Sequence, residues 1–63
     1  MHKNMKIEYG YDRTVKSWCI VLIDNEGNII ASSYAGNKES CEFEIETFKK
    51  EYKVTEVIKL KAY

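Results

Sequence analysis

WCIVLI-DNEGN-IIASSY, residues 18–34, is the stretch that decides the fold of this 63-residue chain. Two apolar runs, residues 18–23 and 29–34, flank five turn-forming residues, and Gly27 among these can adopt a positive φ. The stretch therefore predicts a β-hairpin. Because large apolar side chains occupy consecutive positions of the first run, we expect that strand to be central in a sheet and covered on both faces.

A further strand is predicted before the hairpin. Residues 5–11 alternate, with Ile7, Tyr9 and Tyr11 on one side and small or charged residues on the other, which is the pattern of a half-buried strand. Residues 1–4 are polar, and we expect them to be flexible.

A helix is predicted to follow the hairpin, beginning near Lys38 and ending near Lys53. Its start can be capped by Asn37 or Ser40, and glutamates in its first turns and lysines in its last turn match the helix dipole. An apolar stripe of helical period is formed by Cys41, Ile45, Phe48 and Tyr52. Residues 41–46 also alternate as a strand would, but residues 47–53 break that alternation, which favours the helix.

Alternation returns after Val54 and predicts a last strand. The chain is thus predicted to be a single α+β domain, residues 1–63, of order β-β-β-α-β. We expect an antiparallel, hairpin-based four-stranded sheet with one helix packed on one face. A return through a helix makes the last strand parallel to a neighbour, and we expect that neighbour to be the first strand. One helix cannot cover both faces of four strands, so we expect a homodimer to cover the other face.

Composition narrows the class of protein. Ten Lys and Arg residues balance ten Asp and Glu residues, which weakens long-range attraction to nucleic acid or to an anionic membrane. Cys19 and Cys41 lie in apolar-patterned stretches without a preceding signal peptide, which favours reduced thiols in a cytoplasmic protein over a disulfide. The longest apolar run, residues 18–23, is far shorter than the roughly 20 residues that span a bilayer, so no membrane association is expected.

Residues for catalysis or metal binding are scarce. His2 is the single histidine, and the two cysteines lie in unlike elements, so neither a metal site nor a nucleophile with a neighbouring base is expected. No glycine-rich phosphate loop is present. We therefore expect no cofactor and no enzymatic activity.

The predicted layout resembles the opening half of the ribonuclease H-like fold, a half also used by antitoxins of the HicB type. The match covers residues 7–60, with Val21-Leu22-Ile23-Asp24 to Ile30-Ala31 as the second and third strands and Asn37-Lys38-Glu39-Ser40 at the helix start. The resemblance is one of layout, without a specific family motif. An active enzyme of this fold would hold Mg²⁺ with carboxylates on its first and fourth strands. Here those strands offer Glu8 and the lysines Lys59 and Lys61, so two-metal catalysis is not supported.

Two surfaces are predicted to bind a partner protein. On a helical wheel, Phe43 lies opposite the apolar stripe and is surrounded by Glu39, Glu46 and Lys50, a mostly acidic neighbourhood. An exposed aromatic ring rimmed by charge is typical of an interface anchor, so Phe43, Glu39, Glu42 and Glu46 are the predicted partner-binding residues of this surface. The alternative is a local bend that lets Phe43 cover the edge of the core. Tyr9 and Tyr11, on one face of the first strand, form the second surface.

Four cations form a third candidate surface: Arg13 and Lys16 in the first loop, and Lys59 and Lys61 on the last strand. With neighbouring aromatic rings they could contact a nucleic-acid backbone. Lysines that alternate along an edge strand more often discourage edge-to-edge aggregation, and we favour that interpretation.

The sequence therefore predicts a small, non-enzymatic protein-binding module. Its small size and its composition suggest an inhibitor or regulator of a larger, nucleic-acid-handling protein. Antitoxins and anti-CRISPR-like products of phages or mobile elements are comparable proteins. An acidic helix could occupy a basic nucleic-acid channel on such a target. The alternative is a direct nucleic-acid-binding protein that uses the basic and aromatic sheet surface.

Overall fold

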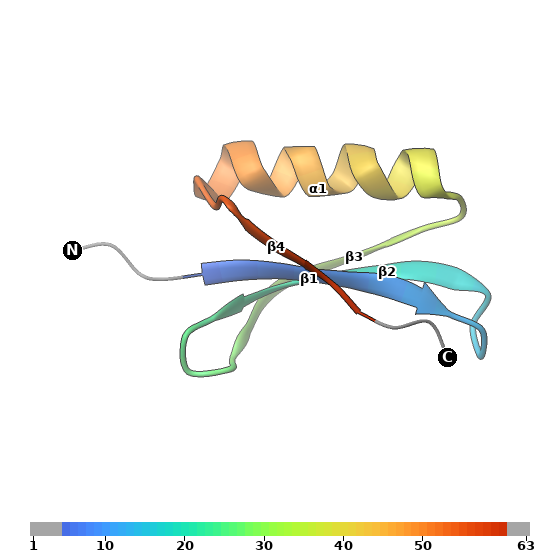
Figure 1. Cartoon of the computed structure of the whole chain (residues 1–63), viewed down its shortest axis with the longest axis horizontal. Helices are drawn as coiled ribbons and strands as arrows, with labels where there is room; N and C mark the ends of the chain where they lie inside the picture. Colours follow the sequence, from blue (N-terminus) through green and yellow to red (C-terminus); the bar gives the residue numbers. More distant parts are fainter. Residues whose placement is uncertain (1–4, 61–63) are drawn as a thin grey trace.

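The structure, a computed structural model, describes residues 5–60 of the chain. Its elements are β1 (Met5–Asp12), β2 (Ser17–Asp24), β3 (Ile29–Ala35), α1 (Lys38–Tyr52) and β4 (Glu56–Lys59) (Figure 1). The predicted α+β class and β-β-β-α-β order are confirmed. The predicted flexibility of residues 1–4 concerns a segment outside the described residues.

The four strands form one mixed sheet in the order β3-β2-β1-β4. β1 pairs with β2, and β2 with β3, in antiparallel fashion, while β4 returns parallel to β1 as predicted. Ile7 lies opposite Leu22 on one side and Val57 on the other. At the end of β4 the Leu60 N–H donates to the Tyr9 carbonyl (2.7 Å), and the side chain of Leu60 lies against Gly10, where a Cβ would come within 3.1 Å of the Leu60 Cβ.

The turn between β2 and β3 is organised by the carboxylate of Asp24. Its Oδ1 accepts hydrogen bonds from the backbone N–H groups of Glu26 and Asn28, both at 2.9 Å, and Gly27 adopts the positive φ of 89° that the turn requires. The register shifts by one residue after the turn, so that a β-bulge at the start of β3 interrupts the pairing with β2. The predicted hairpin is thus confirmed, with a bulge that the sequence pattern did not indicate.

Helix α1 is capped at both ends by local hydrogen bonds. Asn37 is the N-cap, and its Oδ1 accepts from the Ser40 N–H at 2.8 Å. Lys53 ends the helix in the left-handed conformation (φ 55°, ψ 45°), and its N–H donates to the Lys49 carbonyl. The helix therefore begins and ends where the capping residues and the charge pattern predict.

The left-handed C-cap yields a stability prediction. A non-glycine residue is disfavoured at positive φ, so Lys53→Gly should raise the free energy of unfolding by about 1 kcal/mol. The matched control Lys50→Gly, inside the helix, should lower it by about the same amount. Urea unfolding followed by circular dichroism measures both changes, and a loss of stability in Lys53→Gly would contradict the assigned cap geometry.

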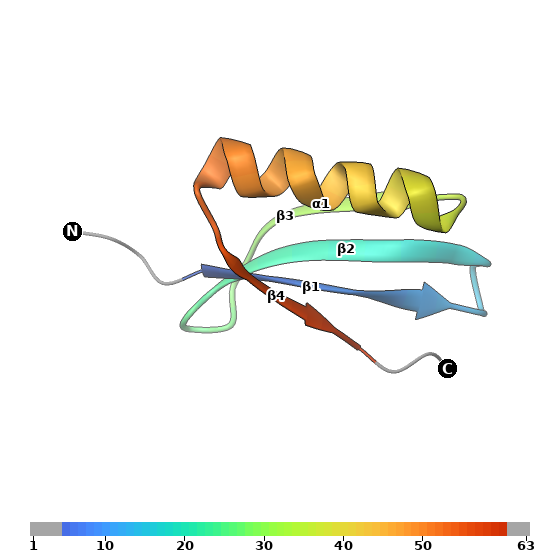
Figure 2. The ribbon, with the colours of Figure 1, turned by 45° about the horizontal axis from the view of Figure 1, so that its top comes forward.

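The hydrophobic core lies between α1 and one face of the sheet (Figure 2). The side chains of Ile7, Ile20, Leu22 and Cys41 are fully buried there. Helix α1 crosses mainly over β2 and β3. Its apolar stripe points at the sheet, as predicted, with Cys41, Ile45 and Phe48 buried.

The second face of the sheet has no covering element among residues 5–60. β2 is central, as predicted, but the expectation that it is covered on both faces is wrong within residues 5–60. Ile20 and Leu22 face α1 and are buried, whereas Cys19, Val21 and Ile23 alternate to the open face and are only half-buried. The reason is topological, because the one helix packs on one face only.

Candidate binding surfaces

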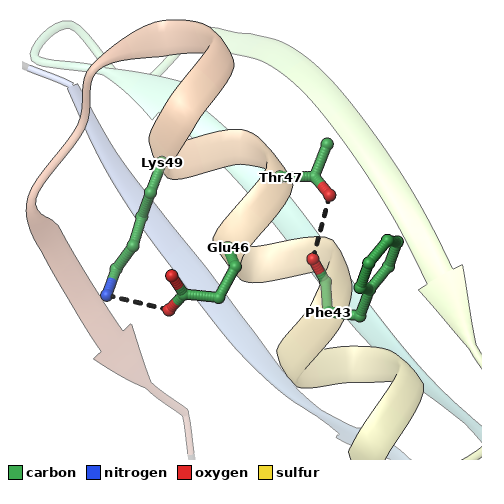
Figure 3. Close-up of polar contacts among 4 residues, drawn as sticks. All are labelled: Phe43, Glu46, Thr47 and Lys49. Atoms are coloured by element: carbon green, nitrogen blue, oxygen red, sulfur yellow. Dashed lines mark hydrogen bonds and ion pairs between the residues drawn. The ribbon is translucent and has the colours of Figure 1, made fainter.

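The outer side of α1 presents the most exposed large apolar side chain of the described residues, Phe43, which is 70% exposed. The predicted outward orientation of this residue is confirmed, and the alternative, that it covers the core edge, is wrong. Among residues 5–60 its ring packs on no other aromatic ring, and its backbone carbonyl accepts a hydrogen bond from the Thr47 hydroxyl at 3.0 Å. Figure 3 shows Phe43 and Thr47 on the side of α1 toward β3.

The predicted acidic residues are distributed around the helix. Glu46 leans to the side of α1 toward β4, where its Oε2 lies 3.3 Å from Lys49 Nζ (Figure 3). Glu42 lies one turn before Glu46 on the same side, and Glu39 lies one turn before Phe43; both are exposed. Lys49 therefore offsets part of the negative charge of the three predicted acidic residues. These residues border Phe43 on one side only.

Two carboxylates outside the predicted set, Glu44 and Glu51, lie on the β3 side of α1. The Ser33 hydroxyl donates to Glu44 Oε1 at 2.9 Å, which holds this carboxylate above β3. Glu51 is exposed two helical turns further on, along the same side. Among residues 5–60, neither Glu44 nor Glu51 lies in an ion pair. Their separation of seven positions, which puts both on one side of a helix, could be read from the sequence. Only the strand order shows which strand that side borders.

β3 forms one edge of the sheet and has no charged side chain in its seven residues. Ile29 and Tyr34 on this strand are 66% and 69% exposed. The opposite edge, β4, has four residues and carries Glu56 and Lys59. Charges on an edge strand discourage pairing with another chain, so β3 is the edge that remains open to strand addition.

Tyr9 and Tyr11 lie on the face of the sheet that carries α1. Both rings pack around Trp18, with centroid distances of 6.3 Å for Tyr9 and 5.6 Å for Tyr11, the latter edge to face. All three side chains are half-buried. They extend the core at one end of the sheet and form an aromatic surface over β1 and β2, where Trp18 lies opposite Ala35 of β3.

The structure brings three of the predicted cations toward one end of the sheet. Arg13 and Lys16 are exposed in the turn after β1, and Lys59 is exposed at the end of β4, which runs parallel to β1. Lys16 adopts a positive φ of 54°. Lys61, the fourth cation, lies outside the described residues.

A surface depression of about 380 Å³ lies at the C-terminal end of α1. It is lined by Lys49, Lys50, Lys53, Val54 and Thr55. Lysines at this position stabilise the negative end of the helix dipole, and the helix carbonyls that meet there would repel an anion. We therefore assign the lysines to helix stability rather than to a ligand site.

Both cysteines are free thiols. Burial raises the pKa of the Cys41 thiol, and the nearby Glu42 raises it further, while Lys38 acts in the opposite direction. Burial and then Asp12 raise the pKa of Cys19. Since the thiolate is the nucleophilic form, neither cysteine is activated at neutral pH.

The raised pKa of Cys41 implies a pH dependence of stability. In the unfolded chain this thiol ionises at lower pH than in the folded chain, so the unfolded state binds fewer protons and stability falls as the pH rises above about 8.5. Urea unfolding of the wild type and of Cys41→Ala at pH 7 and pH 10 isolates this contribution. The alkaline loss should be smaller in Cys41→Ala, and equal losses in both proteins would contradict the assignment.

Within residues 5–60, no group of three or more His, Cys, Asp or Glu side chains is placed to hold a metal ion. No helix in this range is long and apolar enough to cross a membrane. Comparison of the chain with protein-family models, with curated proteins and with solved structures finds no match.

Proposed function

We propose that the chain is a small protein-binding module that acts without catalysis, as an inhibitor or regulator of a larger, nucleic-acid-handling protein. The proposal includes an antitoxin-like or anti-CRISPR-like role in the cytoplasm. The supporting observation is the Phe43 ring, which is 70% exposed although the helix around it is well anchored to the sheet. An aromatic side chain on a rigid element loses little entropy on binding and provides a large contact area.

The charge around Phe43 suggests the character of the target. Glu39, Glu42 and Glu44 lie in the first half of α1, which also carries Lys38, and Lys49 and Lys50 lie in its last turn. The first half of the helix is thus predominantly acidic, with the exposed Phe43 side chain within it. Such a surface complements a basic channel of the kind that holds nucleic acid.

A photo-crosslinking experiment tests this proposal. A benzophenone amino acid replaces Phe43 in one variant and Glu26, in the turn between β2 and β3, in a matched control. Crosslinking in lysate of the native host should give a discrete protein adduct from position 43 only, and excess unmodified chain should compete it away. Equal adducts from both positions, or adducts that Phe43→Ser competes as well as the wild type does, would reject a Phe43-centred interface.

A second candidate function, direct binding of nucleic acid, is favoured by the placement of Arg13, Lys16 and Lys59 toward one end of the sheet, near the aromatic surface of Tyr9 and Tyr11. Binding through phosphates falls steeply with salt. Titration of single- and double-stranded oligonucleotides at 50 and 200 mM salt separates the two functions. Tight, salt-dependent binding that is lost in Arg13→Ala with Lys16→Ala would replace the protein-binding proposal.

A further inference from the structure

The free edge of the sheet and one side of the helix form a continuous surface, which we call the β3 edge surface. It consists of Ile29–Ala35 together with Phe43, Glu44, Thr47 and Glu51 of α1. An edge strand presents unpaired backbone N–H and C=O groups, to which an extended segment can add as a further strand. No charge or proline along β3 prevents this addition.

The charged side chains of the β3 edge surface are both carboxylates. The Ser33 hydroxyl holds the Glu44 carboxylate at 2.9 Å, next to the strand edge, and Glu51 lies about 10 Å further along the helix axis by the helical rise. Among residues 5–60 neither carboxylate has an ion-pair partner. On the opposite side of α1, by contrast, Glu46 is paired with Lys49.

The two faces of an added strand would meet different surroundings. Side chains on the α1 side would meet Ser33, Glu44 and Thr47, and those on the other side would meet Tyr34 and the bulged start of β3. Side chains alternate between the faces of a strand, so the fitting sequence alternates cationic and apolar residues. The carboxylates select Lys or Arg on one face, and exposed Tyr34 and Ile29 select apolar residues on the other.

A second copy of the chain fits this surface less well. If two β3 strands paired with both helices on the same face, the uncompensated Glu44 and Glu51 of each copy would approach those of the other. Like charges brought together in this way oppose association. Charge complementarity therefore favours a basic partner strand over self-pairing.

We propose that the β3 edge surface receives an extended, alternately basic and apolar segment of the partner protein as a fifth strand of the sheet. The inference rests on the proposed function, because it names the binding mode and the chemistry of the protein partner. Backbone hydrogen bonds to β3 supply affinity, and Glu44 and Glu51 supply the selection for Lys or Arg.

A synthetic peptide tests the inference without knowledge of the partner. The probe is an acetylated peptide of alternating lysine and valine, about as long as β3, and the control peptides replace lysine by glutamate or methylate alternate backbone nitrogens. NMR titration of the full chain should show shifts and slowed amide exchange in β3 with the lysine peptide. The glutamate and N-methylated peptides should leave β3 unchanged, because the first is repelled and the second cannot pair.

Charge variants test the role of the carboxylates. Glu44→Gln with Glu51→Gln should weaken binding of the lysine peptide about tenfold, since two charge pairs are lost while the glutamine can still accept from Ser33. The matched control Glu8→Gln with Glu56→Gln removes two carboxylates from β1 and β4, away from the β3 edge, and should leave the affinity unchanged. Equal weakening by both pairs would show that only net charge matters and would overturn the inference.

Two further outcomes separate this inference from the proposed function. A protein adduct from position 43 together with no β3 response to the lysine peptide would leave the proposed function standing and reject strand addition. Concentration-dependent protection of β3 amides without any peptide would identify a second copy as the occupant, and would also overturn the inference.

Discussion

Replacing Phe48 by alanine is expected to lower the free energy of unfolding by about 3–5 kcal/mol. Phe48 is 7% exposed, lies on the sheet side of α1, and packs edge to face on Tyr52 with ring centroids 6.0 Å apart. A domain of this size has a total stability of roughly 3–9 kcal/mol. The substitution should therefore remove at least about a third of the total stability, as measured by urea titration with the fluorescence of Trp18.

Phe43→Ser provides the matched control, in the same helix and for the same residue type. Because the Phe43 ring is 70% exposed, the change in stability should stay within about 0.5 kcal/mol. Similar losses from the two substitutions would mean that the helix is rotated about its axis relative to the arrangement described above.

A second large effect is expected within β2. Ile20 is fully buried against α1, and Ile20→Ala should cost about 2–5 kcal/mol. Val21, its neighbour, is half-buried on the open face, and Val21→Ala should cost less than about 1 kcal/mol in the monomer. Thermal unfolding of both variants at low protein concentration measures the difference between the two faces.

The same pair of variants tests the expected homodimer. If a second copy covers the open face, the cost of Val21→Ala should rise with protein concentration, because dissociation then contributes to unfolding. Sedimentation of the wild type over the same concentrations should show the matching change in mass. A concentration-independent cost below about 1 kcal/mol, with monomer throughout, would reject a dimer that uses this face.

Local patterns predicted most of the fold. Gly27 with its polar neighbours indicated the turn, and Asn37 was one of two candidate caps. The apolar stripe that begins at Cys41 showed which side of the helix faces the core, and this placed Phe43 on the outer side. These features depend on residues within a few positions of one another, where hydrogen bonds and periodicity leave few alternatives. The parallel return of β4 followed from the crossover rule.

Features that depend on strand order could not be predicted in the same way. Glu44 became a candidate because Ser33 binds it and because β3 is the sheet edge, and neither fact is local in sequence. The alternating pattern grouped Tyr9 with Tyr11 but could not show that they pack around Trp18 on the helix side. The apolar residues at odd positions of β2 suggested cover on both faces, whereas residues 5–60 supply cover for one face.

The parallel pairing of β1 with β4 also affects how the protein folds. The hairpin and the helix are closed by contacts between near neighbours, but Lys6 lies opposite Glu56, almost the whole described chain apart. Joining these strands requires the closure of a long loop, an entropic cost that nearby contacts do not offset until the helix has docked. We therefore expect β4 to be the last strand to join the sheet and the first to leave it. The pairing of β1 with β4 should then be the first part of the fold to break when the protein is mechanically stretched.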